Sequence, residues 1–168
     1  MDFAIIVQEP DPSKYHSLRI PASDQWGLIM RRDSPLAQHS CIHLHDLMDI
    51  PLILSRQAMG TEMPKWFGET QDRLHIVATY DLLFNTSVMV REGFGCVLGF
   101  DGLVYTGPDS DLCFRPLEPA LTSSMYIIWR KYQVFSPAAA LLMEKLTAKL
   151  SGASAIGRDM ENPQATGR

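Results

Sequence analysis

The stretch WGLIMRRDSPLA, at residues Trp26–Ala37, says most about the fold of this chain. Its apolar part, Gly27–Met30, is short and is followed at once by charged residues, which is the pattern of a buried strand. Two later stretches belong with it. In PLILSRQ, at Pro51–Gln57, an apolar strand is followed by polar side chains, and in VREGFGC, at Val90–Cys96, a helix end runs through glycines into another strand.

Strand patterns and helix patterns alternate outward from these stretches. Short apolar runs predict strands at Phe3–Val7, Gly27–Met30, Pro51–Leu54, His75–Ala78, Cys96–Leu98 and Met125–Trp129. Helical patterns lie between or after them, at Ile42–Met48, Glu62–Glu69, Asp81–Glu92 and Pro137–Leu150. Strands that alternate with helices favour an α/β fold with a mostly parallel sheet. Because Phe3–Val7 is apolar throughout, we expect that strand to be buried on both faces.

Several residues mark the ends of the predicted helices. Asp81 is a residue type that caps helix N-termini, and Gly93 suits the left-handed residue that ends a helix. Ser136 precedes Pro137, and proline is favoured at the first helical position, so Ser136 is the expected cap of the last helix. Residues 151–168 have no aromatic residue and no periodicity, and we expect a disordered tail there.

Composition limits the class of protein. A chain of 168 residues suits one domain or two small lobes, and 46% hydrophobic with 20% charged residues is typical of soluble globular proteins. The net charge of −4 and the pI of about 5.7 argue against direct DNA binding, which usually needs a basic surface. An odd number of irregularly spaced cysteines favours reduced thiols in the cytoplasm. No signal peptide or membrane span is evident, so we expect no membrane association.

Two motifs resemble chemical sites but have simpler explanations. CIHLHD, at residues 41–46, contains metal-binding side chains, yet the known zinc sites use other spacings, and exposed polar residues before a short helix explain it. GFGCVLG, at residues 93–99, departs from the G-x-G-x-x-G fingerprint and follows a helix where that fingerprint follows a strand. No G-x-S-x-G elbow marks a nucleophile. We therefore predict no metal, no cofactor and no catalytic residue.

The polar residues Ser55, Arg56 and Gln57 directly follow a predicted buried strand. In open parallel sheets, ligands bind beyond the carboxyl ends of the strands. A hydroxyl, a guanidinium and an amide at that place form a donor set suited to a carboxylate. The alternative is that Arg56 pairs with an acidic residue on its own surface.

A second group of candidates lies where the next strand leads into a helix. Thr79, Tyr80 and Asp81 precede the helix, whose first-turn N–H groups can hold an anion, although Asp81 as cap would occupy part of that site. Tyr80, Phe84 and Asn85 could supply the rest of a pocket wall. The alternative is an ordinary capped helix with Phe84 in the core.

Taken in order, these segments resemble the effector-binding domain of LysR-type transcriptional regulators, a bacterial family. The resemblance covers residues 2–150 and rests on Leu28–Ala37, Asp46–Ile53, Val90–Gly95 and Ile127–Pro137. It implies a two-lobed α/β fold like that of type II periplasmic binding proteins, with two crossover strands and a ligand held between the lobes. The first lobe would comprise residues 2–25 and 118–150, and the second lobe residues 26–117.

The resemblance also shows what is missing from this sequence. The family's winged helix-turn-helix and linker helix have no counterpart, and neither do the first strand and helix of the first lobe. We therefore expect an incomplete first lobe, less stable than the second, with an unpaired apolar edge at Phe3–Val7 that invites self-association. The effector contacts that remain as candidates are Gln8, Glu9, Ser55, Arg56, Gln57, Thr79, Tyr80, Phe84 and Asn85.

The function implied by the resemblance is sensing. A small metabolite, with Arg56 suggesting a carboxylate, would close the lobes and so modulate transcription, and DNA would be reached only through a helix-turn-helix domain outside this chain, in a homo-oligomer such as a dimer or tetramer. Three other interpretations remain: a solute-binding protein of a transporter, an enzyme on a similar fold, and an inactive truncated remnant. The absent export signal disfavours the first, and the absent nucleophile–base pair disfavours the second.

Overall fold

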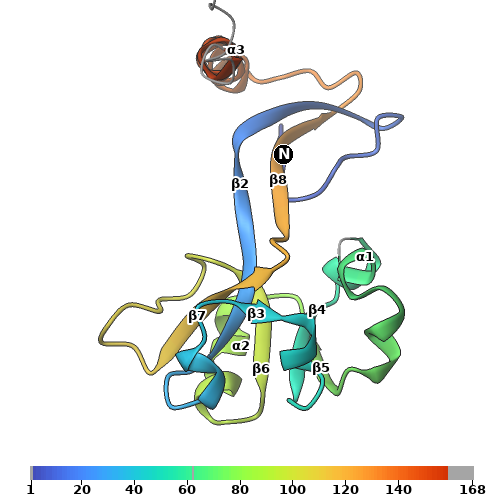
Figure 1. The fold of residues 1–168 in the computed structure, drawn as a ribbon. Helices are drawn as coiled ribbons and strands as arrows, with labels where there is room; N and C mark the ends of the chain where they lie inside the picture. Colours follow the sequence, from blue (N-terminus) through green and yellow to red (C-terminus); the bar gives the residue numbers. More distant parts are fainter. Residues whose placement is uncertain (1, 62, 159–168) are drawn as a thin grey trace, which may run out of the picture. The chain divides into compact units, whose positions relative to one another are not determined.

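The computed structural model of the protein describes residues 2–61 and 63–158, with side chains to residue 150 (Figure 1). Its strands are β1 (Ala4–Ile6), β2 (Tyr15–Arg31), β3 (Ile42–His43), β4 (Leu52–Ser55), β5 (Ile76–Tyr80), β6 (Cys96–Phe100), β7 (Leu112–Glu118) and β8 (Thr122–Arg130). The α-helices are α1 (Met63–Phe67), α2 (Leu83–Arg91) and α3 (Pro137–Arg158). Short 3-10 helices are η1 (Pro35–Gln38), η2 (Leu44–Leu47), η3 (Ala58–Gly60) and η4 (Gly68–Arg73).

The chain divides into two compact units. Unit 1 consists of Met1–Ser23 and Ser124–Arg168, and unit 2 is the continuous segment Asp24–Ser123. Two strands, β2 and β8, contribute residues to both units. Unit 1 is therefore assembled from two separate parts of the sequence, whereas unit 2 is a single insertion between them.

Unit 2 contains a mixed sheet. At its centre β4 lies between β5 and β6 and runs parallel to both, while β2 runs antiparallel to β6 and β7. The expectation of a mostly parallel sheet was wrong, because β2 pairs antiparallel with the predicted strand β6 and also with β7, which the sequence pattern did not reveal. Arg115 and Pro116 interrupt the apolar pattern of that strand, and proline inside a run argues against a strand.

The core of unit 2 lies between α2 and the sheet. Leu83 and Val90 of α2 pack in one buried cluster with Ile29, Ile53 and Val97 from three strands. The helix lies close to β6 at Gly99, where a methyl group would come within 2.7 Å of a Leu83 methyl carbon. Burial of these apolar side chains is the main force that holds α2 on the sheet.

Predictions about the ends of two helices are confirmed, and one helix prediction was wrong. Gly93 has a φ of +76° and ends α2, and the Ser136 hydroxyl accepts a 3.3 Å hydrogen bond from the Ala139 N–H at the start of α3. In place of a helix at Ile42–Met48, the chain forms β3 and η2. In β3 Ile42 pairs with Leu117 of β7. Local periodicity cannot show a partner so distant in the sequence, which is why the helix prediction failed.

Unit 1 is built around β8, which lies between β1 and β2. Ala4 pairs with Ile128 and Ile6 with Tyr126 in antiparallel register. Among the described residues β1 has no partner on its other edge, and Ile5 is 62% exposed. The expectation of a strand buried on both faces was therefore wrong, because the face of β1 that carries Ile5 is exposed.

The last helix extends beyond the predicted boundary. Unit 1 buries Ala139 and Met143 of α3, and the helix runs to Arg158. The disordered tail predicted for residues 151–168 lies, from residue 159 on, outside the described residues. No helix in the described part of the chain is long and apolar enough to cross a membrane.

Candidate functional site

The carboxyl ends of β4 and β5 lie side by side in unit 2 (Figure 1). Leu54 is paired with Thr79 and Ser55 with Tyr80, and the backbone N–H of Arg56 donates a 3.0 Å hydrogen bond to the carbonyl oxygen of Tyr80. Because the two strands are parallel, the residues that follow them emerge at the same edge of the sheet. The two groups of candidates identified in the sequence are therefore neighbours.

Arg56 and Asp81 form an ion pair at this edge. The Arg56 Nε lies 3.7 Å from an oxygen of Asp81, and the two side chains are 67% and 72% exposed. The acidic partner that the sequence left open for Arg56 is thus Asp81. Exposed pairs contribute little to stability because water solvates both charges, so a ligand can compete for either side chain.

The expected capping role of Asp81 was wrong. Helix α2 begins at Leu83, its N-cap is Leu82, and no side chain caps it. Asp81 stands one residue before the cap position, so its carboxylate is not engaged by the first turn of the helix and faces Arg56.

The neighbours of Arg56 have different surroundings. Ser55 is half-buried, and its hydroxyl oxygen accepts a 3.3 Å hydrogen bond from the Ala58 N–H, which fixes the turn into η3. The side chains of Gln57 and Thr79 are exposed. Both can therefore be reached by a molecule in solution at the strand ends.

Tyr80 serves the interior of unit 2. Its hydroxyl donates a 2.8 Å hydrogen bond to the carbonyl oxygen of Leu98 in β6, and burial raises the pKa of Tyr80 well above its ordinary value. The phenol therefore stays neutral and joins β5 to β6. Through this hydrogen bond Tyr80 stabilises the sheet next to the strand ends.

Phe84 and Asn85 lie on the exposed side of α2. Phe84 is 68% exposed, whereas its neighbour Leu83 is only 7% exposed and belongs to the core. The alternative that placed Phe84 in the core was wrong, because α2 packs Leu83 against the sheet and leaves Phe84 exposed. The remaining candidates, Gln8 and Glu9, follow β1 in unit 1, where Gln8 is half-buried and Glu9 is exposed.

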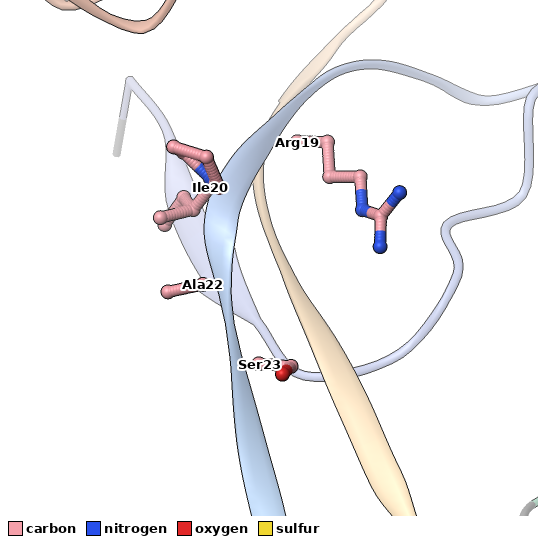
Figure 2. Close-up of a pocket in the computed structure, with 5 residues that line it drawn as sticks. Arg19, Ile20, Ala22 and Ser23 are labelled. Atoms are coloured by element: carbon pink, nitrogen blue, oxygen red, sulfur yellow. The ribbon is translucent and has the colours of Figure 1, made fainter. Parts of the chain in front are cut away.

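Two of the hollows in the described part of the chain contain an arginine of β2, and no sequence pattern indicated either of them. One, of about 370 Å³, follows β2 in unit 1 at residues Arg19–Ser23. Figure 2 shows Arg19 projecting to one side of β2, with Ile20 and Ala22 on the other side. The Arg19 guanidinium donates a 2.9 Å hydrogen bond to the Ser124 hydroxyl oxygen.

The second hollow, of about 380 Å³, is in unit 2 and includes Arg31, Arg32 and Arg91. The Arg31 guanidinium is held by Asp33, with a nitrogen–oxygen distance of 2.9 Å from Nε. The Arg32 guanidinium donates to the backbone carbonyl oxygens of Gly107 (2.7 Å), Ser110 (2.9 Å), Leu112 (3.1 Å) and Thr106 (3.3 Å). Arg31 and Arg32 are therefore engaged by the fold itself.

The CIHLHD segment is held by its own polar contacts. An oxygen of Asp46 accepts a 2.8 Å hydrogen bond from the His43 N–H, and the Cys41 sulfur lies 3.8 Å from the His43 Nε2. The described residues contain no group of three or more histidine, cysteine, aspartate or glutamate side chains placed to hold a metal ion.

Comparison with known proteins gives a consistent result. The family model for the LysR substrate binding domain matches residues 1–151. The uncharacterized HTH-type transcriptional regulator YvbU of Bacillus subtilis (strain 168) is 28% identical over 156 residues, which cover 91% of this chain and 51% of that protein. This chain thus spans about half the length of that relative.

Solved structures show the same fold. HinK, a LysR family transcriptional regulator from Pseudomonas aeruginosa, superposes with a TM-score of 0.69 at 20% identity, over 89% of this chain and 53% of that one. The effector binding domain of QuiR in complex with shikimate gives a TM-score of 0.69 at 17% identity, over 85% of this chain and 68% of that one. The two-lobed α/β fold class predicted from the sequence is confirmed by these similarities.

Proposed function

Because this chain belongs to the LysR substrate binding domain family, we propose that it is the effector-sensing part of a transcriptional regulator, with a carboxylate-containing metabolite as its effector. One observation supports the choice of ligand: the exposed guanidinium of Arg56 stands at the adjacent ends of two parallel strands, next to the carboxylate of Asp81. The similarity in fold to the effector binding domain of QuiR, whose structure contains shikimate, supports the binding of a small molecule in general.

Membership of this family also indicates which class of protein the chain comes from and which part of it would bind DNA. The family's members are transcriptional regulators, which favours a regulator over a transporter's solute-binding protein and over an enzyme. DNA would be contacted by a helix-turn-helix domain in another part of the protein, since relatives are about twice as long and this segment carries a net charge of −4. We propose a cytoplasmic homo-oligomer as the working state.

The chemistry of the strand ends suits a carboxylate. The planar guanidinium of arginine offers paired N–H donors that match the two oxygens of a carboxylate. The hydroxyl of Thr79 is exposed near the same strand ends and can donate a further hydrogen bond. A bound ligand would change the conformation only as far as its affinity differs between the conformations available to the protein.

Titration calorimetry of the full chain with small organic carboxylates, including shikimate, tests this function. We expect at least one ligand whose binding weakens about tenfold or more in Arg56→Gln, because a charge-assisted hydrogen bond contributes roughly 1.5–3 kcal/mol. Arg73→Gln is the matched control, since Arg73 is also an exposed arginine of unit 2 but lies in η4. Ligands that bind wild type and Arg56→Gln equally well would rule out the proposed contact.

A further inference from the structure

We propose that the effector is a zwitterion of the α-amino acid type, whose carboxylate binds Arg56 and whose ammonium group binds Asp81. This inference rests on the proposed function and narrows it, because it names the class of ligand taken by the strand ends of β4 and β5. It comes from the charged pair that the fold creates there.

The two opposite charges are placed by the backbone of adjacent parallel strands. Ser55 and Tyr80 are paired in register, and the next residue of each strand end is a charged one, Arg56 or Asp81. The hydrogen bond from the Arg56 N–H to the Tyr80 carbonyl oxygen fixes the main chain at this point. The bases of the two side chains are therefore held close together, while their charged ends extend outward and are mostly exposed.

Neither charge is needed to hold the fold. The Nε–oxygen distance of 3.7 Å is longer than a hydrogen bond, so the two groups attract each other without a directed contact. Asp81 does not cap α2, whose first turn follows Leu82. A guanidinium and a carboxylate at this distance and exposure can each rotate to accept a partner from solution.

The balance of charge selects between ligands. A ligand with a carboxylate alone would gain Arg56 but would also displace Asp81 from it and face the repulsion of a second negative charge. A ligand with an ammonium group alone meets the reverse problem. A zwitterion supplies a carboxylate for Arg56 and an ammonium group for Asp81. The attraction that the two side chains lose between them is thus replaced by a contact of each with the ligand.

The test uses matched sets of ligands on the full chain. Each standard L-amino acid is titrated beside its deaminated acid and its decarboxylated amine; for leucine these are 4-methylpentanoate and 3-methylbutylamine. The proteins are wild type, Asp81→Asn, Arg56→Gln and the control Asp72→Asn, an exposed aspartate in η4. Asp81 is exposed and caps no helix, so thermal melts should show Asp81→Asn folded like wild type.

We expect wild type to bind at least one amino acid about tenfold or more tightly than its deaminated acid. Asp81→Asn should bind the amino acid more weakly and the deaminated acid more tightly than wild type does, so that the preference disappears. The control Asp72→Asn should keep the preference of wild type.

Two results would overturn the inference, and they differ in meaning. If deaminated acids bind wild type as tightly as the amino acids do and remain sensitive to Arg56→Gln, the zwitterion is wrong and the carboxylate site stands. If no compound binds in a way that depends on Arg56, the proposed function at these strand ends fails as well.

Discussion

The indole nitrogen of Trp26 donates a 2.9 Å hydrogen bond to the hydroxyl oxygen of Ser123, and both residues are only 3% exposed. The two residues are 97 positions apart in the sequence and come from β2 and β8. Unit 2 runs from Asp24 to Ser123, so this bond joins the place where the chain enters the unit to the place where it leaves. The Trp26 ring also packs against Phe100, with ring centroids 4.1 Å apart.

Replacing Ser123 by alanine should destabilise the protein. The buried indole N–H would lose its acceptor, and an unsatisfied buried donor costs about 1–3 kcal/mol. Urea denaturation of Ser123→Ala measures the change. Ser124→Ala is the control, because the hydroxyl next along the chain accepts its bond from Arg19 at an exposed position. Equal losses in the two variants would contradict the importance of the Trp26 bond.

Gly27 should tolerate no side chain. It pairs with Gly99 on one side and Pro116 on the other, and a methyl group on it would overlap the Phe114 ring and the backbone oxygen of Arg115. Overpacking of this kind costs about 1–3 kcal/mol, and more where the backbone itself must move. Thermal and urea unfolding of Gly27→Ala should show that loss.

Gly60→Ala supplies the matched comparison for Gly27→Ala. A methyl group at Gly60 would meet no heavy atom within 4 Å. Its stability should stay level or rise by up to about 1 kcal/mol, because alanine restricts the unfolded chain more than glycine does. If Gly60→Ala lowered stability as much as Gly27→Ala, the loss would have to come from replacing any glycine by alanine and not from the close packing of β2.

Arg32 should govern the order of the segment that links β6 to β7. Its guanidinium donates to four carbonyl oxygens between Thr106 and Leu112, and the single ammonium group of a lysine cannot reproduce that fork. Hydrogen exchange over residues 101–112 should quicken roughly tenfold in Arg32→Lys, which corresponds to about 1.4 kcal/mol of local stability. Arg31→Lys, where the exposed arginine faces Asp33, should leave these amides protected.

Cys96 should make stability depend on alkaline pH. Burial raises the pKa of this thiol from 9.0 to about 11, since the thiolate is disfavoured inside unit 2. Below pH 9.0 the Cys96 thiol is neutral in both the folded and the unfolded protein, and its contribution to the free energy of unfolding is complete. That contribution is lost as the pH rises toward 11, because the thiol ionises first in the unfolded chain. The loss should approach about 2–3 kcal/mol.

Urea unfolding of wild type and Cys96→Ala across that pH range isolates the effect, since other groups that titrate there are common to both proteins. The stability of wild type should fall more steeply than that of the variant. Parallel curves would mean that Cys96 ionises in the folded protein as readily as in the unfolded chain.

Local sequence signals predicted the elements that depend on local interactions. The apolar run before Ser55, the stop at Gly93 and the cap at Ser136 are each readable within a few residues, and the structure has β4, the end of α2 and the start of α3 at those places. Polar residues directly after a buried strand likewise placed Arg56 at a strand end. Such features need no knowledge of distant partners.

Features that depend on pairing across the chain were missed. β7 contains Arg115 and Pro116, and only its neighbours β2 and β3 make it a strand. The same strand draws Ile42 into β3 in place of a helix. For the candidate site, the Arg56–Asp81 pair required knowing that β4 and β5 are adjacent and that α2 begins at Leu83, and neither follows from spacing alone.

The division of unit 1 into two sequence segments also sets an order of events during synthesis. A ribosome releases all of Asp24–Ser123 before most of β8 exists, so unit 2 can collapse around its own core while translation continues. The strand β1 pairs with β8, which is made more than a hundred residues later, and until then its apolar side chains lack that partner. The pairing of β1 with β8 is thus a late event of synthesis, which follows the emergence of unit 2 from the ribosome.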